Sequence, residues 1–279
     1  MTEPPSRTTH LTELQLGDWR RDGYVHVPGV ITGKELDYLR DSIDNISRLY
    51  DGERGVMQHF ERTVDGARIC RSERLIEAHS GLADLINGEH LLGMAGELLG
   101  EPAVLYKEKV NYKLAGGAGF APHQDAPAYP FIATHLTCMI AIDSASPSNG
   151  CLEMVAARHD EVLPMDDAGC IRPDLANAMV WTPISVEAGD LLWFHSYTPH
   201  RSSSNTSPHD RRAVFCTYNA QREGDLRQAY YDEKMAQFTG QHEGHHTRVS
   251  LIGDFRGVAP TADEIAEYRS SRDVSGRDV

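Results

Sequence analysis

The sequence from residue 104 onward is a series of short β-rich runs, and this series constrains the fold more than any other feature. Glycine, proline, asparagine and serine separate the runs, as in the segments SPSNG and EAGD. The predicted strands cover residues 104–114, 135–143, 151–156, 179–184, 190–195 and 213–219. Many short strands in series, without regular strand–helix alternation, are typical of a sandwich or barrel. We predict a mainly β fold with flanking helices around a double-stranded β-helix core, which is a jelly-roll or cupin-like barrel.

Two helices are predicted before these strands, and both should pack outside the barrel. Residues 32–50 begin with Thr32 and Glu35, which match a capping box, and leucine and isoleucine then recur at helical spacing. Residues 89–99 carry their leucines on one stripe, and Gly100 ends this second helix.

The size of the chain suits one large domain. It has 279 residues, of which 40% are hydrophobic, so it can bury a substantial core. The two ends are polar, which is typical of loosely held termini. We expect an N-terminal tail over residues 1–14, one domain over residues 15–258, and a short helix and tail over residues 259–279.

Charge and cysteine content restrict the partners and the compartment. The formal net charge is −14, which disfavours nucleic acid and anionic membranes as partners and leaves a small molecule as the expected ligand. No apolar run reaches the length of a membrane helix, and the first residues lack a signal-peptide segment. The five cysteines are odd in number and show no CxxC, so we expect free thiols in a reducing cytoplasm. The sequence makes no prediction of the oligomeric state.

A possible metal site begins with His123 and Asp125, which lie in the segment GGAGFAPHQDAPAY. On a strand, residues i and i+2 point to the same face, about 6–7 Å apart. His200, far downstream, would complete a set of two imidazoles and one carboxylate. Such a set leaves the opposite metal positions open and suits non-haem Fe(II) that activates O₂. A His-x-Asp pair also occurs by chance as a surface ion pair, so spacing alone does not establish the site.

Arg211 and Ser202 could add an anion site next to the third histidine. Residues 205–208 (NTSP) have turn chemistry, and a hairpin centred there would place Ser202 opposite Arg211. An oxygenase that consumes 2-oxoglutarate needs a cation for the distal carboxylate, and one charge-assisted hydrogen bond is worth about 1.5–3 kcal/mol. In the alternative interpretation, Arg211 is an ordinary surface residue.

Three lysines alternate along the predicted strand over residues 104–114. Lys107, Lys109 and Lys113 share one face with Asn111. If this face lies inside the barrel, the cations require an anion such as a phosphate, phosphonate or carboxylate, and Lys107 and Lys109 are then candidate substrate-binding residues. The alternative is an edge strand whose lysines face water.

The chain resembles the phytanoyl-CoA dioxygenase-type Fe(II)/2-oxoglutarate oxygenases, a family that includes ectoine hydroxylase. The resemblance covers about residues 20–255 and is strongest in YKEKVNYKLAGGAGFAPHQDAPAY, GDLLWFHSYTPHRSSSN and RRAVFCTYN. It implies a jelly-roll enzyme that uses Fe(II), 2-oxoglutarate and O₂. It also implies catalytic iron ligands at His123, Asp125 and His200, and 2-oxoglutarate contacts at Asn111, Ser202 and Arg211.

The segments YKEKVNYK and YNAQREGDLRQAYYDEK resemble the bacterial branch of the family that hydroxylates 2-aminoethylphosphonate. We therefore expect a dioxygenase that hydroxylates a C–H bond of a small polar metabolite, anionic or zwitterionic, with 2-aminoethylphosphonate or a related aminophosphonate as the first choice. A free amino acid or a betaine-like compound is the alternative.

Two further alternatives belong to other classes of protein. The stretch from His242 to His246 contains Glu243 and matches the HExxH motif of zinc proteases, but Gly244 and the missing apolar stripe disfavour the required helix. A loop over the mouth of the site, in a position to lend a histidine to the substrate, fits this stretch better. A non-catalytic jelly-roll binding module is the other alternative, although such a module does not need three metal ligands together with Arg211.

Overall fold

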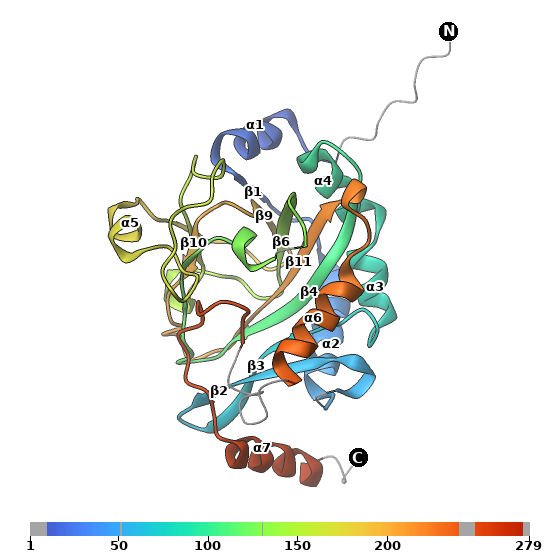
Figure 1. The fold of residues 1–279 in the computed structure, drawn as a ribbon. Helices are drawn as coiled ribbons and strands as arrows, with labels where there is room; N and C mark the ends of the chain where they lie inside the picture. Colours follow the sequence, from blue (N-terminus) through green and yellow to red (C-terminus); the bar gives the residue numbers. More distant parts are fainter. Residues whose placement is uncertain (1–9, 51, 130, 240–248, 276–279) are drawn as a thin grey trace.

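Two antiparallel sheets form the centre of the computed structural model, which describes residues 10–50, 52–129, 131–239 and 249–275 (Figure 1). The larger sheet contains, in spatial order, β1 (Tyr24–Val27), β9 (Leu191–His195), β6 (His135–Ala141), β11 (Arg211–Ala220), β4 (Ala103–Lys113), β3 (Gly66–Glu73) and β2 (Met57–Thr63). The smaller sheet contains β5 (Phe120–His123), β10 (His200–Ser202), β7 (Leu152–Met154) and β8 (Thr182–Ile184). The prediction of a mainly β fold is confirmed.

Most helices flank the larger sheet, namely α1 (Glu13–Asp22), α2 (Gly33–Arg48), α3 (Ser80–Ile86), α4 (Glu89–Leu99), α6 (Arg227–Thr239) and α7 (Ala262–Ser275). Helix α5 (Pro173–Ala178) packs with Leu163 and Ile171 in a separate small apolar cluster. The two predicted helices are confirmed as α2 and α4. Thr32 is the N-cap residue of α2, but its side chain makes no capping hydrogen bond, so the predicted capping box is wrong. None of the helices in the described ranges is long and apolar enough to cross a bilayer.

The main apolar core lies between the larger sheet and the helices. Leu39 and Ile43 of α2 pack there with Trp193 and Tyr218, all at most 1% exposed. Every residue of β6 is buried, because one face meets this core and the other faces the smaller sheet. Burying one such leucine or isoleucine side chain contributes about 1.5–3 kcal/mol, so the helices hold the sheet firmly from one side.

Strands β1, β2 and β3 precede residue 104 and were not among the predicted strands. The sequences of β2 and β3 lack the alternation of apolar and exposed polar residues that predicts a strand, because both strands bury polar side chains. The buried polar residues of this hairpin are Gln58, His59, Glu61, Arg71, Ser72 and Glu73. Two of them, Glu61 and Arg71, line a pocket between the two sheets.

The predicted hairpin between Ser202 and Arg211 is wrong. Strand β10 pairs with β5 and β7 in the smaller sheet, whereas β11 pairs with β4 and β6 in the larger one. The turn itself forms, since the Asn205 side chain accepts from the Ser207 amide at 2.9 Å and donates to the Lys113 carbonyl at 3.0 Å. It therefore carries the chain from one sheet to the other. Residue parity cannot tell a hairpin from two strands that face each other across a barrel.

Candidate active site

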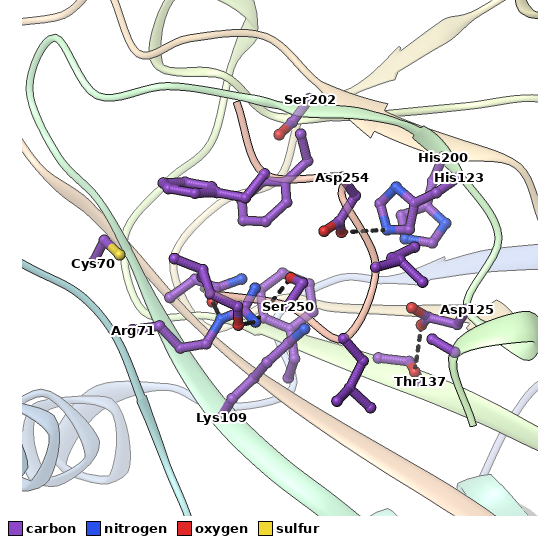
Figure 2. A pocket seen from close by; sticks show the side chains of 18 of the residues that line it. Cys70, Arg71, Lys109, His123, Asp125, Thr137, His200, Ser202, Ser250 and Asp254 are labelled. Carbon is purple, nitrogen blue, oxygen red and sulfur yellow. Dashed lines mark hydrogen bonds and ion pairs between the residues drawn. The ribbon is translucent and has the colours of Figure 1, made fainter. Parts of the chain in front are cut away.

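A pocket opens between the two sheets. Its walls come from β4 and β11 of the larger sheet, from β5 and β10 of the smaller one, and from the segment over residues 249–255 (Figure 2). Lysine and arginine side chains line it together with a few carboxylates and aromatic rings. It contains every site residue that the sequence predicts.

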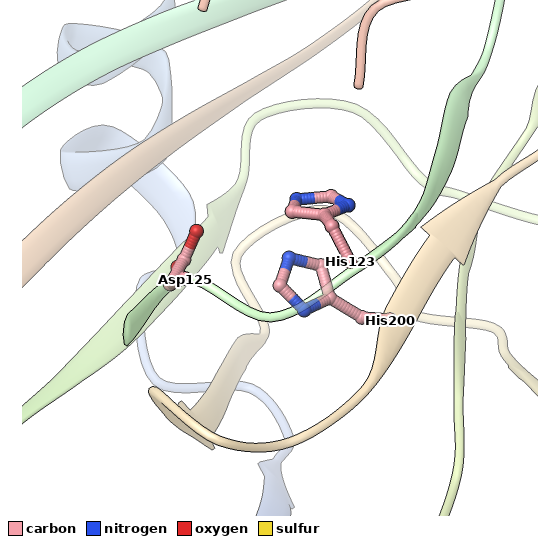
Figure 3. Close-up of side chains that lie close together, drawn as sticks. All are labelled: His123, Asp125 and His200. Carbon is pink, nitrogen blue, oxygen red and sulfur yellow. The ribbon is translucent and has the colours of Figure 1, made fainter. Parts of the chain in front are cut away.

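The two histidines and the aspartate meet at this pocket (Figure 3). One ligand atom from each of His123, Asp125 and His200 lies within 4.8 Å of the others, and the three side chains are buried. Antiparallel pairing of β5 with β10 sets His200 directly opposite His123, with ring centroids 4.1 Å apart. The register of two neighbouring strands thus brings distant parts of the sequence to one point.

Asp125 reaches this point by a different backbone conformation from the strand that the sequence predicts. Strand β5 ends at His123, and Asp125 has helical backbone angles (φ −72°, ψ −32°) at the start of a short 3-10 turn over Ala126–Ala128. Its carboxylate is therefore placed by a turn of the chain and not by strand alternation. Gln124 points away, as predicted, and its amide joins three segments by hydrogen bonds to Glu161, Leu163 and Tyr197.

Backbone carbonyls orient both imidazoles. Nδ1 of His123 lies 2.7 Å from the carbonyl oxygen of Ala121, and Nδ1 of His200 lies 3.0 Å from that of Thr198. A carbonyl can only accept, so each Nδ1 carries the proton and each Nε2 keeps a lone pair for a metal. Burial, together with the neighbouring His123, lowers the pKa of His200 to about 4, which keeps its imidazole neutral near pH 7.

The carboxylate of this cluster is ionised. Burial acts to raise the pKa of Asp125, but the nearby His200, Lys107 and Lys109 outweigh it and hold this pKa well below its usual range. Thr137 donates a hydrogen bond of 3.3 Å to Oδ2, which leaves Oδ1 for a ligand. Two imidazoles and one carboxylate with open space beside them fit a divalent iron ion.

A second cationic group lies where β4 and β11 pair. Arg211 stands opposite Lys113 in the register, and both side chains are buried. The ammonium of Lys113 donates to the Ser202 hydroxyl at 2.7 Å, so Ser202 and Arg211 do share one end of the pocket, although across two sheets. Burial and the neighbouring Arg211 lower the pKa of Lys113 to about 7. Two adjacent buried cations favour an anion between them.

Backbone carbonyls steer the Arg211 guanidinium. It donates to the carbonyls of Asn149 at 3.4 Å and Gly150 at 3.0 Å. Gly150 adopts φ +69°, and a Cβ there would lie 2.4 Å from the Ser203 carbonyl oxygen. Only glycine fits this close approach, so the SPSNG turn positions the arginine.

The lysine face of β4 points into the pocket. Lys107, Lys109, Asn111 and Lys113 all line it, so the edge-strand alternative is wrong. Lys107 packs 3.9 Å from the centre of the Tyr129 ring and contacts its hydroxyl, and burial holds the pKa of Lys107 well below normal. Burial lowers the pKa of Lys109 to about 8.

Two pocket residues had no signal in the sequence. Arg71 of β3 is buried and donates to the Asn111 side chain at 2.8 Å, which orients that amide. Asp254 is buried beside His123, with Oδ2 3.4 Å from Nε2. The sequence alone would place both charged residues on the surface, and only the tertiary structure shows that they line the pocket. The HExxH stretch, His242 to His246, lies outside the described residues.

Comparisons with known proteins agree with this geometry. The model of the family "Phytanoyl-CoA dioxygenase (PhyH)" matches residues 19–213. Methylphosphonate hydroxylase of Gimesia maris is 42% identical over 255 residues, which cover 89% of this chain and 97% of that protein. The 2-aminoethylphosphonate dioxygenase of an uncultured bacterium (HF130_AEPn_1) is 38% identical over 240 residues, which cover 84% of this chain and 92% of that protein.

Among solved structures, EctD from S. alaskensis, crystallised with 2-oxoglutarate and 5-hydroxyectoine, superposes with a TM-score of 0.67. It is 20% identical and covers 79% of this chain and 80% of its own, so the likeness concerns the fold and confirms the jelly-roll core. The family match extends over most of the chain and includes His123, Asp125, His200 and Arg211. The chain therefore belongs to the phytanoyl-CoA dioxygenase family and is an enzyme of the dioxygenase class.

Proposed function

We propose that this enzyme uses Fe(II), 2-oxoglutarate and O₂ to hydroxylate a C–H bond of a small phosphonate, with 2-aminoethylphosphonate or a related aminophosphonate as the first choice. The observation that carries the proposal is the convergence of His123, Asp125 and His200 in a pocket rich in buried cations. The two relatives named above act, by their names, on phosphonates. A free amino acid or a betaine remains the alternative substrate.

The iron would be held by Nε2 of His123, Nε2 of His200 and Oδ1 of Asp125. With 2-oxoglutarate and O₂ it supplies the oxidation in which R–H becomes R–OH while 2-oxoglutarate becomes succinate and CO₂. The protein contributes orientation, because the hydrogen bonds from the two Nδ1 atoms fix both rings.

The distal carboxylate of 2-oxoglutarate would bind between Arg211, Lys113 and Ser202. This is the end of the pocket where two buried cations and a hydroxyl already meet. Asn111 would contact the other end of the molecule, and Arg71 fixes the orientation of its amide. The length of 2-oxoglutarate would then join the anion site to the metal site.

The phosphonate would bind at Lys109, with Lys107 behind it. The Lys109 ammonium has no hydrogen-bond or ion-pair partner within the described ranges, so it is available for a ligand. Lys107 is held against Tyr129 and contributes charge more than a direct bond. A doubly negative phosphonate raises the pKa of both lysines toward normal and is thereby bound more strongly.

We further propose that residues 15–258 form the catalytic domain and that it works in a reducing compartment, the cytoplasm. All five cysteines are free and buried, and ferrous iron needs reducing conditions. Helix α7 follows this domain and packs on it through Ile265, which belongs to the main core.

The test is succinate formation under ferrous conditions with a panel of 2-aminoethylphosphonate, methylphosphonate, proline, ectoine and glycine betaine. We expect a phosphonate to give hydroxylated product and succinate in equal amounts. Asp125→Ala is the control and should give neither. Turnover of only the amino acids or the betaine would refute the phosphonate assignment, and no succinate with any member of the panel would refute this whole substrate range.

A further inference from the structure

Asp254 is a buried carboxylate that the proposed reaction does not yet use. The residue is 4% exposed and lines the same pocket as the metal cluster (Figure 2). Its Oδ1 atom is buried and has no hydrogen-bond partner within the part of the chain that the structure describes. A buried carboxylate without a donor is costly, so the position requires a positive partner.

His123 contacts only one oxygen of this carboxylate. Its Nε2 lies 3.4 Å from Oδ2 of Asp254, and its Nδ1 contacts the Ala121 carbonyl. Oδ1 therefore remains without a partner among the described residues. A metal ion on Nε2 would compensate Oδ2 in part and would leave Oδ1 unpaired.

Asp254 is also not an evident fourth metal ligand. The cluster of described residues whose ligand atoms all lie within 4.8 Å of one another contains His123, Asp125 and His200 only. The carboxylate thus lies beside the metal site and faces the space where a substrate would bind.

The backbone holds this carboxylate in place. The Ala121 amide donates to the Asp254 carbonyl at 2.7 Å, and the Gly253 amide donates to the Ala168 carbonyl at 2.7 Å. Phe255 forms a bridge with Phe120 of β5, with ring centroids 5.3 Å apart. A polar group held this firmly is preorganised for a ligand.

We propose that Asp254 binds the ammonium group of the substrate and so determines specificity for a zwitterion. This rests on the proposed function and deepens it. The substrate carries its phosphonate at Lys109 and its amine at Asp254, and the reacting C–H bond lies near the metal cluster that Asp254 adjoins. An alkylphosphonate without an amine would leave the buried carboxylate unpaired and would bind more weakly.

The test compares ligands that differ only in the ammonium group. The pairs are 2-aminoethylphosphonate with propylphosphonate, and β-alanine with butyrate, titrated by anaerobic calorimetry into the Fe(II)- and 2-oxoglutarate-loaded enzyme. One charge-assisted hydrogen bond predicts that the amine is preferred by about 10- to 150-fold. In Asp254→Asn the preference should fall by at least about 10-fold, while propylphosphonate binds as before.

A matched control is Glu61→Gln. Glu61 is another buried pocket carboxylate, but it already accepts a hydrogen bond of 2.8 Å from the Ala118 amide, so its loss should leave the preference unchanged. If Asp254 acts only through the metal, Asp254→Asn will weaken both members of a pair equally, which overturns the proposal.

The outcomes separate this inference from the proposed function. If the wild-type enzyme binds propylphosphonate as tightly as 2-aminoethylphosphonate, the role of Asp254 is refuted and the phosphonate assignment stands; this comparison needs no variant. If β-alanine alone binds, and does so through Asp254, the phosphonate assignment fails and the role of Asp254 stands. Binding of none of the four ligands rejects both the role of Asp254 and 2-aminoethylphosphonate as the substrate.

Discussion

Arg211→Ala should raise the requirement for 2-oxoglutarate without changing the affinity for iron. Arg211 is 6% exposed and stands opposite Lys113 in the strand register. A charge-assisted hydrogen bond to a carboxylate is worth about 1.5–3 kcal/mol, which corresponds to about 10- to 150-fold in affinity. Lys113 and Ser202 remain in the variant, so we expect the lower part of that range, about 10- to 50-fold in KM.

The assay measures succinate formation against 2-oxoglutarate concentration, with Fe(II) affinity determined separately. Arg212→Ala is the matched control, because Arg212 is engaged away from the pocket by Asp143 at 2.9 Å and by Asp44 at 2.5 Å. It should lose stability but keep the wild-type KM. The reasoning is refuted if KM is unchanged in Arg211→Ala or rises equally in both variants.

Three other predictions follow from buried groups of the site. Asp125→Ala should lose the shift in unfolding midpoint that Fe(II) gives the wild type, which is worth about 2.7 kcal/mol at a hundredfold excess over Kd; a retained shift would remove Asp125 from the ligands. The pKa of Lys113 is lowered to about 7 by burial and Arg211, and lysine is charged only below its pKa. A bound anion raises that pKa again, so 2-oxoglutarate binding should take up a proton at pH 8 and almost none at pH 6. Calorimetry in buffers of different ionisation enthalpy measures this uptake, and buffer-independent heats at pH 8 would contradict it. Gln124→Leu should lower the free energy of unfolding by about 2–5 kcal/mol in chemical denaturation, because one buried and two partly buried backbone groups lose their partner; an effect below about 1 kcal/mol would show that water replaces the amide.

The pattern of the sequence predicted the β-rich core and helices α2 and α4 because these depend on local periodicity. It failed for β2 and β3, where buried Arg71 and Glu73 pair with other elements. Glu73 accepts a hydrogen bond of 2.6 Å from Lys234 of α6, a contact that joins segments far apart in the chain. Local periodicity cannot predict that a charged residue is buried when its partner lies in another element.

The residues of the metal cluster followed from the family motif, and the lysine face of β4 followed from alternation. The predicted backbone geometry was wrong for Asp125 and for Ser202. Asp125 reaches the cluster by a turn after β5, and Ser202 meets Arg211 across two sheets rather than in a hairpin. Parity within one strand is a local property, whereas the choice of partner strand depends on the whole barrel.

The sequence by itself determined the kind of chemistry through its resemblance to an oxygenase family, because the spacing of His123, Asp125 and His200 alone also occurs by chance. Tertiary structure alone decided which charges surround the ligand. Arg71 and Asp254 enter the pocket only because sheet pairing buries them there, and burial in a medium of low dielectric is what makes an isolated carboxylate select a positive group.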